Sequence, residues 1–193
     1  MRRRFAIILG GGRSARMGRD KRALTVGGRS LLAIAVDACA SRDAIVVVSP
    51  DLPDDVPADR VTRTLEDPPF GGPVAGIAAG MAALPPAVPG DEVLLLACDL
   101  PRVSEIVPVL DAIELAGPAG VDGICLFDAE GYPQYLAGRY RRTALDARLT
   151  AVGETRGLPV RRLMAALDVR GLAAAELTTD VDTPDEAAAA GLD

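Results

Sequence analysis

The sequence predicts an α/β protein of three layers (α/β/α), in which helices cover both faces of a mostly parallel mixed sheet. Short β-branched and aliphatic runs alternate along the chain with stretches that have the apolar spacing of helices. Hydrophobic residues make up 49% of the 193 residues and aromatic residues only 3%, so we expect a core of Ala, Val, Leu and Ile, which suits strands buried on both faces. No long linker divides the chain, and we expect a single domain over residues 1–193.

The strands are predicted from short apolar runs that are bounded by Gly, Pro, Asp or Ser. The clearest are Ala-Ile-Val-Val-Val-Ser at 44–49 and Val-Leu-Leu-Leu-Ala-Cys at 93–98. In chain order, the expected strands are residues 5–9, 44–49, 61–65, 93–98, 122–127, 135–140 and 175–178.

The helices are predicted from longer stretches with a periodic apolar face. Pro73 favours a helix start at that point. A second helix start is indicated at 183–186, where Thr183 is suited to the N-cap, Pro184 to the first helical position and Glu186 to the third. In chain order, the expected helices are residues 30–40, 73–84, 103–115, 141–152, 160–167 and 184–190.

Composition excludes several classes of function. The formal net charge of −6 argues against a nucleic-acid partner, and no apolar run reaches the length that spans a membrane. The three cysteines are isolated from one another, which favours a reduced, cytoplasmic protein over a disulfide framework. The chain has no histidine, so Ser-His or Cys-His nucleophiles and histidine-bound metals are excluded.

A glycine-rich turn follows the first predicted strand. It runs Leu9-Gly10-Gly11-Gly12-Arg13-Ser14-Ala15-Arg16-Met17-Gly18-Arg19-Asp20-Lys21. The chain has 21 Lys and Arg residues, and Lys21 is the only lysine among them. Bare backbone N–H groups of glycine can approach phosphate oxygens closely, and cations just beyond the turn neutralise them. The turn therefore predicts a site for a nucleoside triphosphate.

Two other phosphate motifs were compared with this turn. A Walker loop requires Gly-Lys-Ser/Thr, whereas Lys21 stands between Asp20 and Arg22. A dinucleotide fingerprint is matched by Gly10, Gly12 and Ala15, and Asp51 follows the second strand where that motif places an acid. That motif does not account for Arg-Met-Gly at 16–18, but a dinucleotide-binding oxidoreductase stays open as an alternative of another class.

Asp99 is the candidate metal ligand. It follows the apolar run at 93–98, and ligand sites of open α/β sheets lie at the carboxyl edge of the strands. A carboxylate there can hold Mg²⁺ while substrate phosphates and water complete the shell. Asp182, with Asp180 before it, is a second candidate, although a helix start explains most of that segment.

The glycine turn, with Leu24, Gly28 and Leu31-Leu32 behind it, resembles the signature of the MobA-type nucleotidyltransferases, whose type member is molybdenum cofactor guanylyltransferase. Further blocks follow in the family's order over nearly the whole chain. They are Glu66-Asp67-Pro68-Pro69, Gly71-Gly72-Pro73-Val74-Ala75-Gly76-Ile77, Cys98-Asp99-Leu100-Pro101, Pro133-Gln134-Tyr135-Leu136 and Asp180-Val181-Asp182-Thr183-Pro184-Asp185-Glu186.

The resemblance implies a fold of the nucleotide-diphosphosugar transferase type and a Mg²⁺-dependent transfer of GMP from GTP to molybdenum-bound molybdopterin, with release of pyrophosphate. It assigns catalytic roles to Arg16, Lys21 and Asp99. Nucleotide contacts fall on Leu9, Gly10, Gly11, Gly12, Ser14, Lys21, Asp67, Gly72 and Asp99, and metal contacts on Asp99 and, as a second candidate, Asp182. Transient contact with cofactor-synthesis or acceptor proteins would follow from such a role.

Two departures from the family pattern keep a second activity open. The guanylyltransferases carry asparagines where this chain has Asp180 and Asp182, and an asparagine soon after the second strand, where this chain reads Ser49-Pro50-Asp51. A cytidylyltransferase, or a guanylyltransferase for another phosphorylated metabolite, is the alternative. Five arginines are candidates for an anionic second substrate, namely Arg139, Arg141, Arg142, Arg161 and Arg162.

Overall fold

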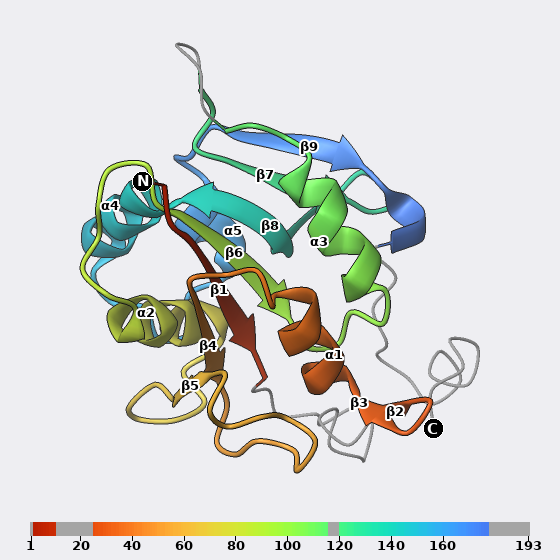
Figure 1. The fold of residues 1–193 in the computed structure, drawn as a ribbon. Coiled ribbons are helices and arrows are strands. Elements are labelled where there is room, and N and C mark those ends of the chain that lie inside the picture. The colour runs from red at the N-terminus through yellow and green to blue at the C-terminus, as the bar shows by residue number, and fades with distance from the viewer. Residues whose placement is uncertain (1, 11–24, 116–119, 178–193) are drawn as a thin grey trace.

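Seven strands form one sheet with the order β5-β4-β1-β6-β8-β7-β9 (Figure 1). The structure is a computed structural model that describes residues 2–10, 25–115 and 120–177. The strands of the sheet are β1 (Arg4–Leu9), β4 (Ala44–Val48), β5 (Thr62–Thr64), β6 (Glu92–Ala97), β7 (Gly123–Phe127), β8 (Pro133–Arg141) and β9 (Val169–Ala173). A separate antiparallel pair consists of β2 (Thr25–Val26) and β3 (Arg29–Ser30).

Within the sheet, β8 runs against its neighbours and the other described strands share one direction. The strands β5, β4, β1 and β6 pair in parallel, β8 is antiparallel to both β6 and β7, and β9 is parallel to β7. The predicted mostly parallel mixed sheet is therefore confirmed. Because β1, β4, β5 and β6 run side by side in one direction, the segments that follow them emerge at the same edge.

Helices cover both faces of the sheet, as Figure 1 shows. On one face, α1 (Leu31–Ala38) and α3 (Val103–Asp111) pack on strand residues such as Ile8, Val47 and Leu96. On the other, α2 (Pro73–Ala83), α4 (Arg142–Val152) and α5 (Val160–Met164) pack on alternate residues such as Ile7 and Leu95. Side chains of a strand alternate between faces, so each central strand contributes to both cores. The three predicted layers are confirmed.

Most predicted elements form within a few residues of their expected bounds. Ser30 is the N-cap of α1, and its hydroxyl accepts a hydrogen bond from Ala33 N. Helix α3 contains Pro108 and ends at Asp111, earlier than the expected 115. Among the described residues no helix is long and apolar enough to cross a bilayer.

The expected strand at 175–178 is wrong. The described residues Ala175–Leu177 form a short 3₁₀ helix, and the outer strand is β9, which lies earlier, at Val169–Ala173. Strand β9 has only exposed and half-buried residues and lies at the edge of the sheet, and its sequence Val-Arg-Gly-Leu-Ala has little apolar signal. The strand conformation of β9 is decided by its pairing with β7 and not by the strand propensity of its residues. The expected helix at 184–190 lies outside the described residues.

Candidate active site at the carboxyl edge of the sheet

The segments that leave β1, β4 and β6 are bound to one another at the carboxyl edge. Gly10 N donates to Val48 O at 2.9 Å, and Cys98 N donates to Leu9 O at 3.1 Å. These bonds continue the parallel ladders by one residue beyond the strands. Leu9 and Gly10, predicted to open the phosphate turn, are thereby brought beside the segment that leads into Asp99.

Gly10 is packed so closely against the end of β4 that a side chain there would require Ser49 to shift. A Cβ at Gly10 would lie 3.1 Å from Ser49 Cβ and 3.3 Å from Ser49 Oγ. Ser49 is fully buried, and its hydroxyl has no hydrogen-bond partner among the described residues. Contact with the neighbouring strand therefore favours a glycine as the first residue of the turn.

Asp99 stands two residues after the end of β6 and is half-buried. The described residues hold no group of three His, Cys, Asp or Glu side chains that would enclose a metal ion. A single carboxylate at an open edge fits Mg²⁺ of the kind that is held by one protein ligand together with phosphate oxygens and water. The donor set therefore suits a cation that arrives with a phosphorylated substrate.

The loop between β5 and α2 forms another wall of this edge. Asp67 is exposed in it, and the loop closes on itself where Gly71 N donates to Glu66 Oε1 at 3.1 Å. Gly72 has φ 90° and is the N-cap of α2 without a side-chain cap, so a glycine is needed there. Further along α2, a Cβ at Gly76 would lie 3.3 Å from Leu9 Cδ2, which shows that the helix packs closely on the end of β1.

The structure thus brings Leu9, Gly10, Asp67, Gly72 and Asp99 to one edge of the sheet. The remaining predicted site residues lie outside the described residues. These are Gly11, Gly12, Ser14, Arg16, Lys21 and Asp182.

Three of the five arginines suggested for an anionic second substrate lie away from this edge. Arg139 and Arg141 lie at the end of β8, which runs the other way, and Arg142 begins α4, so all three lie at the amino edge. Arg139 is buried and donates to Glu92 Oε2 at 3.0 Å. Burial lowers the pKa of Arg139 to about 10. The sequence does not show this placement, because the reversed direction of β8 cannot be read from it.

Ser49 is the residue of the site that sequence reasoning missed. The sequence predicts Ser49 only as the last residue of an apolar strand, whereas in the structure its side chain lies against Gly10. The sequence signal for this contact is a polar residue that directly follows the apolar run Ile-Val-Val-Val.

The chain resembles known proteins over most of its length. The profile of the MobA-like NTP transferase domain matches residues 6–171. A probable molybdenum cofactor guanylyltransferase of Nostoc sp. is 34% identical over 154 residues, which cover 72% of this chain and 67% of that protein. A second one, from Trichormus variabilis, is 40% identical over 100 residues, or 51% of this chain and 46% of that protein. The chain spans about half the length of most curated relatives it matches.

Solved structures share the fold. Molybdopterin-guanine dinucleotide biosynthesis protein A from Archaeoglobus fulgidus has a TM-score of 0.65 at 19% identity, with 97% of this chain and 96% of that chain covered. Rv0371C of Mycobacterium tuberculosis H37Rv, solved in complex with manganese, has a TM-score of 0.60 at 18% identity, with 97% of both chains covered. From the profile match over most of its length, this chain belongs to the MobA-like NTP transferase family.

Proposed function

We propose that this protein transfers GMP from GTP to the terminal phosphate of molybdenum-bound molybdopterin and releases pyrophosphate. The observation that carries the proposal is the convergence of the Gly10 backbone, the Asp67 loop and Asp99 at one sheet edge. Curated relatives named as molybdenum cofactor guanylyltransferases support the choice of donor and acceptor.

The transfer requires positioning and neutralisation of charge more than proton transfer, which fits a chain without histidine. An acceptor phosphate oxygen attacks the α-phosphorus of GTP, and the bond to the pyrophosphate oxygen breaks. In this proposal the N–H groups of Gly10, Gly11 and Gly12 hold phosphate oxygens, and Arg16 and Lys21 neutralise the developing charge.

Asp99 is proposed to hold a divalent cation, Mg²⁺, which when bound neutralises phosphate charge. The manganese complex of the related Mycobacterium tuberculosis structure supports a divalent cation in this fold. Asp67 and the start of α2 at Gly72 are proposed to contact the nucleotide, and Leu9 and Ser14 belong to the same turn. Asp182 stays the second candidate for the metal.

The alternative within the family is a cytidylyltransferase or a guanylyltransferase with another phosphorylated acceptor, because Asp180 and Asp182 depart from the asparagines of the guanylyltransferase pattern. The family match leaves the oxidoreductase alternative without support. We place the reaction in the cytoplasm, where the free thiols of Cys39, Cys98 and Cys125 would stay reduced. Nucleic acid and membrane are not among the proposed partners, whereas transient contact with acceptor proteins is.

Release of pyrophosphate tests the proposal. The full chain is given molybdenum-bound molybdopterin, Mg²⁺ and each of four nucleoside triphosphates in turn, and GTP is expected to be the preferred donor. A site that pairs the polar edge of guanine can discriminate by up to about 10⁴-fold. Preference for CTP would move the protein to the cytidylyl alternative, and no turnover with any triphosphate would overturn nucleotidyl transfer.

Lys21→Ala tests the proposed role of the glycine turn. Loss of one preorganised charge should lower turnover by about 10²–10³-fold, with a smaller loss of nucleotide affinity. Full turnover in a folded Lys21→Ala protein would contradict the role given to this residue.

A further inference from the structure

A second segment, distant in sequence, is bound to the loop that carries Asp67. The link between α4 and α5 follows Val152 and contains Arg156 and Gly157. Arg156 Nη1 donates to Pro68 O at 2.9 Å, and its Nη2 donates to Pro69 O at 3.4 Å. Gly157 N donates to Gly71 O at 2.7 Å. Three hydrogen bonds thus join two adjacent residues of the link to this loop.

Two neighbouring residues of the loop lack a backbone hydrogen-bond donor. Pro68 and Pro69 have no N–H group, so only their carbonyls can take part in backbone hydrogen bonds. Both residues are exposed, as is Asp67 before them. The two carbonyls are the ones that Arg156 binds. The planar guanidinium presents its donors in a rigid fork, which suits two neighbouring carbonyls.

Gly157 lies close to Gly72, the N-cap residue of α2. Gly157 has φ 68°, in the region that favours glycine, and a Cβ built on Gly72 would lie 4.0 Å from Gly157 Cα. A Cβ on Gly71 would lie 2.7 Å from Ala75 Cβ and 3.4 Å from Arg156 Nη1. The link therefore lies directly against the residues where the loop turns into α2.

We propose that Arg156 and Gly157 are positioning residues that hold the loop 66–72, and with it Asp67 and the first turn of α2, in the conformation that receives the nucleotide base and ribose. The inference rests on the proposed function, since it concerns how that same site binds GTP. Arg156 acts through the loop and does not touch the reacting phosphates. Its loss should weaken GTP binding while the chemical step proceeds at nearly the same rate in the bound complex.

Arg156→Ala is the central variant. It removes both carbonyl contacts, so we expect the Kd and KM for GTP to rise about three- to tenfold, with kcat changed less than twofold. Arg156→Lys should recover part of the affinity, because an ammonium reaches one carbonyl but has no fork for two. The KM for the acceptor should not change.

Arg148→Ala is the matched control. Arg148 also donates to two backbone carbonyls, those of Leu163 at 3.1 Å and Arg162 at 3.4 Å, but it ties α4 to α5 and leaves the loop 66–72 untouched. Its removal should leave GTP affinity unchanged. Amide hydrogen exchange of the ligand-free chain supplies a readout besides activity: the loop peptide should exchange faster in Arg156→Ala than in wild type or in Arg148→Ala.

Each outcome is decisive. Faster exchange in the loop together with a raised KM for GTP supports the proposal. Unchanged exchange and unchanged GTP affinity in Arg156→Ala overturn it while wild type still transfers GMP. A raised KM for the acceptor alone would show that Arg156 binds the second substrate and would also overturn it. If wild-type protein neither binds GTP nor transfers GMP, the proposed function has failed. The exchange result then still shows whether Arg156 restrains the loop 66–72.

Discussion

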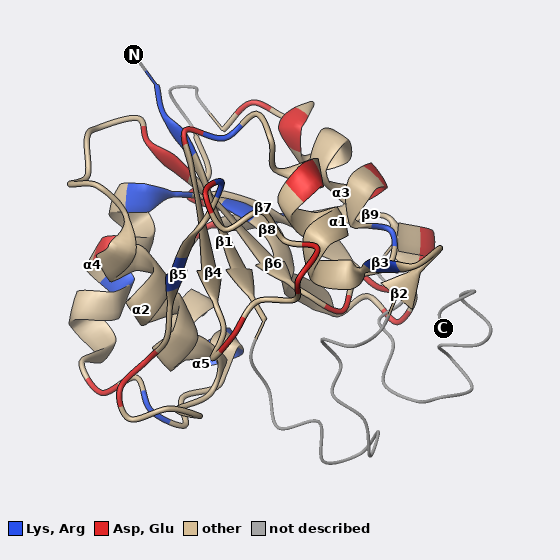
Figure 2. Cartoon of the chain, turned by 60° about the horizontal axis from the view of Figure 1, so that its bottom comes forward, with Lys and Arg blue, Asp and Glu red and all other residues tan. Residues whose placement is uncertain are grey.

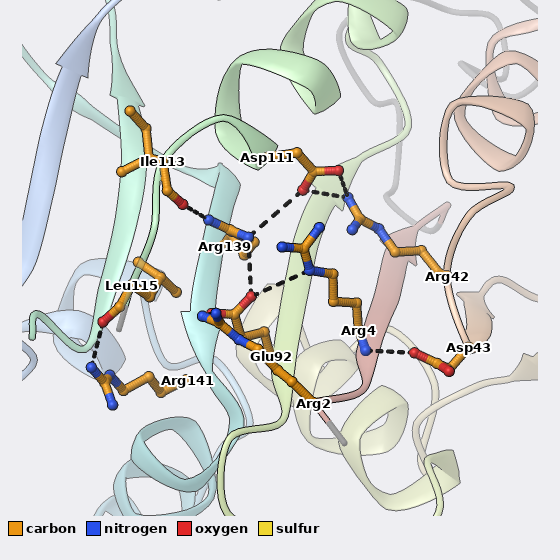
Figure 3. A network of polar contacts seen from close by, with 10 residues as sticks. All are labelled: Arg2, Arg4, Arg42, Asp43, Glu92, Asp111, Ile113, Leu115, Arg139 and Arg141. Carbon is orange, nitrogen blue, oxygen red and sulfur yellow. Dashed lines mark hydrogen bonds and ion pairs between the residues drawn. The ribbon is translucent and has the colours of Figure 1, made fainter. Parts of the chain in front are cut away.

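The two ends of the central strands are built from different chemistry. At the carboxyl edge, β1 continues into Gly10, and β6 into the half-buried Asp99. At the amino edge, Figure 3 shows Glu92 among three arginines. The Glu92 carboxylate is buried and pairs with Arg2, with Arg4 at 3.8 Å and with Arg139 at 3.0 Å.

Further charged side chains at the amino edge are also paired with one another. Arg42 is buried and binds both carboxylate oxygens of Asp111 at 2.9 Å, and Arg3 donates to Asp91 at 2.5 Å. Figure 2 shows basic and acidic stretches close together around the amino end of β1. At this edge the acidic side chains are paired with arginines of the protein itself. At the carboxyl edge, by contrast, we propose that backbone groups and the Asp99 carboxylate bind a ligand.

The largest expected effect is at the amino edge. Glu92→Gln removes the carboxylate that Arg139, Arg2 and Arg4 share. Because a buried cation without its partner is costly, the free energy of unfolding should fall by about 3–5 kcal/mol, measured by urea denaturation. The kcat of protein that remains folded should not change.

Glu105→Gln is the control for this variant, since the Arg102–Glu105 pair is exposed and one helical turn apart. It should leave stability nearly unchanged. If Glu92→Gln were equally harmless, the buried network would not be what stabilises this edge.

Asp99→Asn should show the reverse pattern. The substitution is nearly isosteric, so the urea midpoint should stay close to that of wild type. Loss of the charge that a hard cation requires should lower turnover by about 10²–10³-fold and raise the Mg²⁺ concentration for half-activity. Should Asp182→Asn have this effect while Asp99→Asn does not, Asp182 is the metal ligand.

Gly10→Ala tests whether the carboxyl edge is as closely packed as the core. The added methyl group would press on Ser49, and overpacking of this kind costs about 1–3 kcal/mol of stability. The double variant Gly10→Ala with Ser49→Gly removes the opposing Cβ and should recover stability. Additive losses in this double-mutant cycle would show that the two residues are not in contact.

The smallest effect concerns pH at the amino edge. The hydrogen bond from the Arg3 guanidinium lowers the pKa of Asp91 below its usual value of 3.8. A carboxyl group with a depressed folded-state pKa contributes stability that is present above its unfolded pKa and lost as pH falls through the folded one. Asp91→Asn should therefore reduce the unfolding free energy at pH 7 more than at pH 3. Equal losses at both values would contradict the ionic contribution.

Prediction from sequence succeeds where the signal is local. Strands β1, β4 and β6 are buried on both faces, so their continuous apolar residues by themselves indicate a strand. Sequence also placed Gly10 and Asp99 directly after strands. It failed at β9, whose half-exposed edge residues carry little apolar pattern, and at Ser49, whose role depends on a neighbouring strand.

Sequence by itself determined the alternation of strands and helices and the exclusion of histidine chemistry, whereas the phosphate-binding role of the glycine turn stays a prediction. The family match agrees with that reading. Only the tertiary structure decided the reversed direction of β8, which takes Arg139 away from the site and pairs it with Glu92, 47 residues earlier. It also decided that Arg156 meets the Asp67 loop 88 residues away. Such pairings follow from long-range strand order and packing, whereas propensity and periodicity act only between near neighbours in the chain.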